Sequence, residues 1–215
     1  MPCIAKAIFW DHDGVLVDTE RLYFQATRDV LATVGVRLAV DSYRQLFLKE
    51  SRGAWHLAAE RGIAAAEIEK LRALRNERYR DMLLKGDVVV PGALELLERL
   101  KPRYRMAVVT SSHREHFDAI HNRTRLGGLV EFVVTPGDYT HYKPHPEPYL
   151  LALGRLGLPA GECIAVEDSE RGLQSARAAG IRCLIVRTEM TAGCAFEGAE
   201  RCFASLEEVG RFLLA

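Results

Sequence analysis

The sequence predicts an α/β protein, with a doubly wound, Rossmann-like parallel sheet and an inserted α-helical subdomain. Two observations support this fold class. From Asp87 onward, short β-branched and apolar runs alternate with amphipathic segments, as in a parallel sheet covered by helices on both faces. Between residues 17 and 85, by contrast, apolar residues recur at helical spacing and no strand pattern interrupts them.

The first apolar run, from Ile4 to Trp10, has the length and composition of a buried strand. The next convincing strand begins only at Met106, although a βαβ unit needs only about 30 residues. This excess predicts two domains: residues 1–16 and 86–215 form an α/β core, and residues 17–85 form an inserted helical cap. Because the insertion follows the first strand, we expect the cap to act as a lid above the carboxyl ends of the strands.

The remaining elements follow from periodicity and from start and stop signals. In the cap, the pattern predicts helices at 18–34, 41–48, 52–61 and 66–84. In the core, it predicts helices at 92–101, 113–123, 146–156 and 170–179, and strands at 106–110, 132–135, 163–166 and 183–186. Gly157 ends one helix, and Ser205 with Glu208 forms a capping box at the start of the last one.

Composition narrows the functional class. The 215 residues include 29 basic and 29 acidic ones, so the formal charge of zero gives no support for a nucleic-acid partner. No apolar run approaches the roughly 20 residues that span a bilayer, and we expect neither a membrane partner nor a signal peptide. The five cysteines are odd in number and contain no CxxC pair, which favours a reduced, cytoplasmic protein. The sequence does not identify a protein partner.

Polar side chains follow several predicted strands, at the sheet edge where ligands bind in open α/β folds. Four such sets are present: Asp11 with Asp13, Thr110 with Ser111, Lys143, and Glu167 with Asp168. Buried carboxylates need a cation or a reaction, and two converging ones could hold Mg²⁺ while one attacks an electrophile. Taken singly, each set is open to a simpler interpretation as turn, helix-cap or solvated loop residues.

Four ordered stretches carry a resemblance to a known family. They are Asp11-His12-Asp13-Gly14-Val15-Leu16-Val17-Asp18, Thr110, Lys143-Pro144-His145-Pro146, and Glu167-Asp168-Ser169-Glu170-Arg171-Gly172. In these motifs the whole chain resembles the haloacid dehalogenase superfamily, in its helical-cap branch, and is similar to phosphoglycolate phosphatases and β-phosphoglucomutase-like proteins. His12 is unusual, since an apolar residue often stands there, and we expect it to serve packing or a local hydrogen bond.

The resemblance implies a role for each motif residue. Asp11 would be the nucleophile that forms an aspartyl-phosphate, and Asp13 would protonate the leaving oxygen and later deprotonate water. Thr110 and the Ser111 amide would bind phosphoryl oxygens, while Lys143 would offset the charge between nucleophile and phosphate.

The resemblance also implies a Mg²⁺ cofactor. Its ligands would be the Asp11 carboxylate, the Asp13 backbone carbonyl and Asp168. Glu167 would contribute through a bound water, or by holding a direct ligand in place.

The implied activity is that of a phosphatase, because dehalogenases and phosphonoacetaldehyde hydrolases of this superfamily lack an acid at the position of Asp13. We therefore expect a phosphoric monoester hydrolase acting on a small phosphorylated metabolite, such as a sugar phosphate or phosphoglycolate. In the cap, Lys49 and Arg52 are assigned to the non-reacting end of the substrate, with Trp55 nearby. Two solvated cations at a helix end are an equally open interpretation of that pair.

Two alternatives remain. A β-phosphoglucomutase-like enzyme would carry a histidine where this chain has Tyr23, which weakens that reading. A phospho-acceptor signalling module also combines an acceptor Asp, a hydroxyl, a Lys and Mg²⁺ on a doubly wound sheet. The insertion and Asp13 argue against the signalling module.

Overall fold

The computed structural model describes residues 5–50, 52–122 and 124–215. Cys3, Ile4, Ser51 and Arg123, which entered the sequence-based predictions, lie outside the described residues. The chain divides into two compact units, Met1–Asp18 with Val88–Ala215, and Thr19–Asp87. The second unit begins and ends two residues later than the predicted insertion at 17–85.

The reason for this offset is the pairing of the two connecting segments. Val17 forms a β-bridge with Val89, and the Asp18 amide donates a hydrogen bond to the Val88 carbonyl at 2.7 Å. These residues therefore belong to the first unit, and the chain leaves that unit only after Asp18.

The first unit contains a six-stranded sheet in the order β3-β2-β1-β4-β5-β6, with every neighbouring pair parallel. The strands are β1 Ala7–Trp10, β2 Arg105–Val109, β3 Phe132–Val134, β4 Cys163–Glu167, β5 Arg182–Val186 and β6 Arg201–Phe203. This arrangement confirms the predicted α/β fold class. The strand missing from the prediction is β6, which is short, lies at the sheet edge and exposes Arg201 and Cys202, so it shows little apolar pattern.

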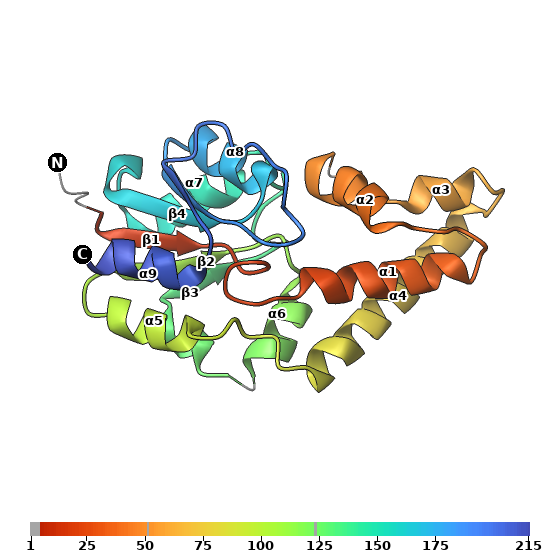
Figure 1. Ribbon diagram of the computed structural model, residues 1–215, viewed down its shortest axis with the longest axis horizontal. Helices are drawn as coiled ribbons and strands as arrows, with labels where there is room; N and C mark the ends of the chain where they lie inside the picture. The colour runs from red at the N-terminus through yellow and green to blue at the C-terminus, as the bar shows by residue number, and fades with distance from the viewer. Residues whose placement is uncertain (1–4, 51, 123) are drawn as a thin grey trace. The chain divides into compact units, whose positions relative to one another are not determined.

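Helices cover both faces of this sheet (Figure 1). Alternation along β1 sends Ile8 and Trp10 to one face and Ala7 and Phe9 to the other. The Trp10 face packs against α5 Ala93–Leu100, α6 Arg114–His121 and α9 Leu206–Leu214, while the Phe9 face packs against α7 Glu147–Leu156 and α8 Glu170–Ala178. Two short 3₁₀ helices, Leu126–Leu129 and Ala160–Glu162, lie before β3 and β4.

The predicted helix boundaries in this unit have clear local causes. Gly157 adopts φ 65° at the end of α7, a left-handed conformation that favours glycine. The Ser205 hydroxyl accepts a hydrogen bond from the Glu208 amide at 3.3 Å, and the Glu208 carboxylate accepts one from the Ala204 amide at 2.9 Å. The predicted stop and cap are thus confirmed.

The second unit is entirely helical in its described residues. It contains α1 Glu20–Ala32, α2 Val40–Tyr43, the π-helix η1 Arg44–Lys49, α3 Trp55–Ala59 and α4 Ala65–Lys85. Helices α1 and α4 pack together, with the rings of Tyr23 and Tyr79 in edge-to-face contact at 5.1 Å. The single helix predicted at 41–48 instead widens into η1, where the rings of Tyr43 and Phe47 stack at 4.4 Å. Across the described part of the chain, every helix is too short or too polar to span a bilayer.

Candidate active site

Three adjacent strands bring the predicted polar residues to one edge of the sheet. Strand β1 lies between β2 and β4. Asp11 follows the end of β1, Thr110 follows β2, and Asp168 follows β4. The Asp11 amide continues the ladder by donating to the Val166 carbonyl at 2.8 Å. Since parallel strands end at the same edge, residues far apart in sequence become neighbours there.

Lys143 supplies the positive charge of this cluster. Its Nζ lies 2.7 Å from Asp11 Oδ1, 2.6 Å from Glu167 Oε1 and 2.7 Å from the Val109 carbonyl oxygen. These three acceptors match the three N–H donors of an ammonium group. Burial alone would lower the pKa of Lys143, but the Asp11 and Glu167 carboxylates raise it above its ordinary value. Lys143 is therefore a buried, charged and fully hydrogen-bonded side chain rather than a solvated loop lysine.

Glu167 is held from three directions. Its Oε1 atom also accepts a hydrogen bond from the Tyr149 hydroxyl at 2.5 Å, and the side chain is fully buried. Burial and the nearby Glu167 charge raise the pKa of Tyr149 well above its ordinary value, so the phenol remains a donor. A Cβ atom at Gly172 would lie 1.9 Å from Glu167 Oε2, so only glycine lets the start of α8 pass so close. Tyr149 gave no signal in the sequence beyond its place in an amphipathic helix.

The Asp13 carboxylate is anchored to the end of β2. Ser112 Oγ lies 2.6 Å and Thr110 Oγ1 lies 3.4 Å from Asp13 Oδ2, and the Ser112 amide donates to Thr110 Oγ1 at 2.9 Å. Asp11 and Asp13 thus have different partners, an ammonium for the first and hydroxyl groups for the second. Ser112 was not predicted, although its hydroxyl two residues after Thr110 was a usable signal. Ser111, between them, is partly exposed in the same turn.

His12 is fully buried between these two aspartates. Its Nδ1 atom lies 3.3 Å from Asp13 Oδ2, and its Nε2 atom lies 2.7 Å from His121 Nε2. The local hydrogen bond expected of His12 is therefore present, together with a second one to α6.

The acidic residues of the cluster fit a divalent cation. Asp11, Glu167 and Asp168 are all buried, and each offers an oxygen within 4.8 Å of the other two. Burial and the Glu167 charge raise the pKa of Asp11 to about 7, while Lys143 opposes this rise. Three buried carboxylates thus face one ammonium, and a hard divalent cation with oxygen ligands would balance the excess negative charge. The Oε1 atom of Glu167 accepts from both Lys143 and Tyr149, whereas its Oε2 atom is buried without a hydrogen-bond partner among the described residues and is open to a cation or to a water bound to one.

A second cluster of side chains of the kinds that bind metals, His141, His145 and Glu147, stabilises a turn. Glu147 accepts hydrogen bonds from the Thr140 and His141 amides, both at 2.8 Å, and its Oε2 atom lies 2.6 Å from His141 Nδ1. These bonds lower the pKa of Glu147 to about 2. The carboxylate therefore organises the loop that carries Lys143.

The cap residues Lys49 and Arg52 are both exposed in the second unit, where Lys49 ends η1. Their assignment to substrate binding stays a prediction. A residue that the prediction missed is Arg75, which is only 7% exposed although it is charged. Its guanidinium lies 4.4 Å from the Tyr23 ring centroid and 5.6 Å from that of Trp55.

Arg75 stands out because no carboxylate of residues 5–50, 52–122 or 124–215 forms an ion pair with it. Its recorded hydrogen bonds go to Asn76 Oδ1 at 2.8 Å and Thr27 Oγ1 at 3.4 Å. A signal did exist in the sequence, because Arg75 interrupts the apolar stripe of Ile68, Leu71 and Tyr79 along α4. A buried guanidinium without an acidic partner is suited to an anionic ligand.

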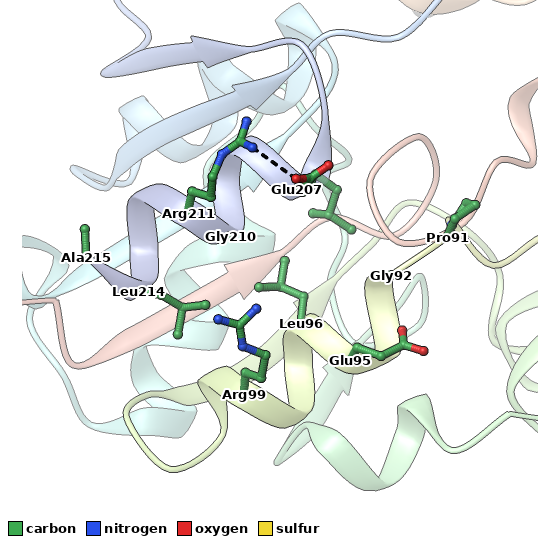
Figure 2. A pocket seen from close by; sticks show the side chains of 11 residues that line it. Pro91, Gly92, Glu95, Leu96, Arg99, Glu207, Gly210, Arg211, Leu214 and Ala215 are labelled. Atoms are coloured by element: carbon green, nitrogen blue, oxygen red, sulfur yellow. Dashed lines mark hydrogen bonds and ion pairs between the residues drawn. The ribbon is translucent and has the colours of Figure 1, made fainter.

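A groove of about 560 Å³ lies elsewhere in the first unit, between α5 and α9 (Figure 2). It is lined by Pro91, Gly92, Glu95, Leu96, Arg99, Leu206, Glu207, Gly210, Arg211, Leu214 and Ala215. Its only ion pair drawn in the close-up is that of Arg211 with Glu207, at 3.0 Å. None of the carboxylate cluster lines this groove, so the chemistry is assigned to the strand ends.

A doubly wound parallel sheet with the buried residues Asp11, Lys143 and Glu167 clustered at its carboxyl edge, and Asp168 beside them, has the arrangement of an enzyme that uses a nucleophilic carboxylate. The model of the haloacid dehalogenase-like hydrolase family matches residues 5–180, and the chain belongs to this family. The predicted superfamily is thus confirmed.

Relatives of known class extend this result. The chain is 35% identical over 207 residues to protein CbbY of Rhodobacter capsulatus, covering 91% of each chain. It is 32% identical over 181 residues to the phosphorylated carbohydrates phosphatase of Thermotoga maritima, covering 82% of each. A solved structure of a CbbY variant from Rhodobacter sphaeroides with xylulose-(1,5)bisphosphate has a TM-score of 0.80 and 26% identity, covering 96% of each chain. The predicted enzyme class, phosphoric monoester hydrolase, is confirmed.

Proposed function

We propose that this protein is a Mg²⁺-dependent phosphatase that hydrolyses a small sugar phosphate through an aspartyl-phosphate on Asp11. The observation that carries the proposal is that the two aspartates after β1 have different hydrogen-bond partners. Asp11 is paired with Lys143, whereas Asp13 is paired with the hydroxyls of Ser112 and Thr110. One carboxylate is thereby suited to attack and the other to proton transfer.

In the first step, an Asp11 carboxylate oxygen attacks phosphorus, the bond to the ester oxygen breaks, and Asp13 gives its proton to that oxygen. In the second step, Asp13 takes a proton from the water that attacks the aspartyl-phosphate, which releases inorganic phosphate and restores Asp11. Lys143 stays charged throughout and lowers the repulsion between Asp11 and the phosphate. Thr110 and the Ser111 amide are proposed to bind phosphoryl oxygens.

Asp11, Asp168 and the Asp13 backbone carbonyl would hold Mg²⁺, and Glu167 would contribute through water. When bound, the ion supplies positive charge that offsets the repulsion between the anionic nucleophile and the anionic ester. The crowding of three buried carboxylates around one ammonium supports this assignment.

Two facts favour a sugar phosphate over other esters. Two of the relatives are a phosphatase of phosphorylated carbohydrates and a CbbY solved with a sugar bisphosphate. Within the cap, the buried Arg75 has no acidic partner among the described residues and would bind a second anionic group. We therefore propose that the substrate carries such a group at its non-reacting end.

The test is Mg²⁺-dependent release of phosphate from a panel of sugar mono- and bisphosphates and phosphoglycolate. Asp11→Asn should abolish turnover, and a chelator should do so reversibly. Retained turnover in Asp11→Asn would rule out the proposed mechanism. The mutase alternative would show bisphosphate-dependent isomerisation without net phosphate release, so the same assay separates the two.

A further inference from the structure

Four side chains form a continuous chain of hydrogen bonds that starts at Asp13 and runs away from the carboxylate cluster. Asp13 Oδ2 lies 3.3 Å from His12 Nδ1, His12 Nε2 lies 2.7 Å from His121 Nε2, and His121 Nδ1 lies 2.8 Å from Thr124 Oγ1. His12 is 0% and His121 8% exposed, so water does not compete with the links between the rings. We call this chain, Asp13-His12-His121-Thr124, the histidine relay.

The chemistry of the relay assigns a donor to each link. A carboxylate only accepts, so His12 Nδ1–H donates to Asp13 Oδ2. With the hydrogen of His12 on Nδ1, its Nε2 atom accepts from His121 Nε2–H. His121 Nδ1 in turn accepts from the Thr124 hydroxyl. Every link then has one donor and one acceptor, and the position of the hydrogen on each ring is set by its neighbour.

The surroundings favour an uncharged His121. Burial together with the nearby His12 ring lowers the pKa of His121 to about 3. Phe117 packs against both rings, with centroid distances of 5.0 Å to His12 and 4.2 Å to His121. The relay is therefore held by packing as well as by hydrogen bonds.

We propose that His12 and His121 are positioning residues for the acid–base group Asp13, a role that rests on the proposed function. His12, Ser112 and Thr110 all contact the same oxygen of Asp13, Oδ2, and so fix the carboxyl plane. His121 and Thr124 keep the His12 tautomer that donates to Asp13. The relay thus presents Asp13 to the ester oxygen in one orientation.

If the two histidines position Asp13, the loss of activity in their variants should depend on the leaving group of the substrate. Aryl esters such as p-nitrophenyl phosphate leave without a proton, whereas the alkyl oxygen of a sugar phosphate needs one. The kcat/KM ratio reports only steps up to departure of the alcohol. His12→Leu and His121→Leu should therefore lower kcat/KM for the sugar phosphate by roughly tenfold to a hundredfold through kcat, and for p-nitrophenyl phosphate by less than about twofold.

Two further variants separate hydrogen bonding from packing. His12→Asn keeps an N–H group near the Nδ1 position and should restore most of the activity on the sugar phosphate. Phe117→Leu loosens the packing of both rings but leaves the hydrogen bonds in place. It should therefore change kcat/KM by the same factor for both substrates. Equal losses on both substrates in His12→Leu and His121→Leu, or no loss at all, would overturn the relay.

Asp13→Asn distinguishes failure of the relay from failure of the proposed function. If Asp13→Asn loses activity selectively on the sugar phosphate and the histidine variants do not, the relay is wrong and Asp13 remains the acid. If Asp13→Asn shows no such selectivity, the proposed role of Asp13 is wrong and the relay falls with it.

Discussion

Gly14 and Asp168 are in such close contact that a Cβ atom at residue 14 would lie 2.1 Å from Asp168 Oδ2. Gly14 also adopts φ 81°, so the residue after the second aspartate is constrained both by its backbone and by its neighbour. The turn that follows β1 is thereby shaped around a proposed metal ligand.

Gly14→Ala should therefore weaken Mg²⁺ binding by displacing the Asp168 carboxylate. We expect the Mg²⁺ concentration for half-maximal activity to rise by about tenfold to a hundredfold. The matched control is Gly92→Ala, because Gly92 has φ 80° and, its chain neighbours aside, no atom of the described residues lies within 4 Å of its Cβ position. Both variants should lose about 1–2 kcal/mol of unfolding free energy from the left-handed backbone, but only Gly14→Ala should change the Mg²⁺ dependence.

Arg75→Met tests whether Arg75 in the cap binds the second anionic group of the substrate. Removing the buried guanidinium should raise KM for a sugar bisphosphate by about tenfold to a hundredfold, the size of a lost charge-assisted hydrogen bond, and leave KM for the matching monophosphate nearly unchanged. Arg72→Met is the control, since Arg72 also lies 5.6 Å from the Trp55 ring but is exposed and paired with Glu69. Equal effects on both substrates would show that Arg75 only supports the cap.

Tyr149→Phe removes the hydroxyl that donates to Glu167 at 2.5 Å and keeps the ring. The unfolding free energy should fall by about 1.5–3 kcal/mol, because the lost bond is to a buried charge. Tyr139→Phe provides the comparison. Its hydroxyl donates to the neutral Thr110 carbonyl at 2.9 Å, and its loss should cost only about 0.5–1.5 kcal/mol. Urea denaturation of the two variants measures the difference.

Glu147 gives the fold a dependence on pH. Its pKa is about 2 in the folded protein against an ordinary value of 4.5, because two amides and His141 bind its charged form. A carboxylate with a lowered pKa stabilises the fold above 4.5, and this contribution disappears as the pH falls toward 2. Glu147→Gln should therefore be less stable than the wild type at neutral pH, and the gap should close on acidification.

The control for this variant is Glu207→Gln, since Glu207 is exposed and, within the described part of the chain, its one recorded ion pair is with the exposed Arg211 at 3.0 Å. Thermal unfolding of all three proteins over the acidic range provides the measurement. A gap between the wild type and Glu147→Gln that stays constant with pH would contradict the assignment.

Much of the fold was predictable because its signals are local. The apolar runs of β1, β2 and β4 and the residues that follow them are short stretches of sequence, and parallel pairing places their ends together whatever the loops do. Asp11, Lys143, Glu167 and Asp168 were placed together on that basis. The edge strand β6 escaped because two of its three residues are exposed, so burial imposed no pattern on them.

By itself, the sequence determined the fold class, the order of the motifs and the charged residues at the strand ends. Only the tertiary structure decided which oxygen or ring each of them meets. Tyr149 reaches Glu167, Ser112 reaches Asp13 and His121 reaches His12 across 18, 99 and 109 residues of sequence. Such contacts depend on how helices pack on the sheet, and packing geometry has no periodicity in the sequence from which it can be inferred.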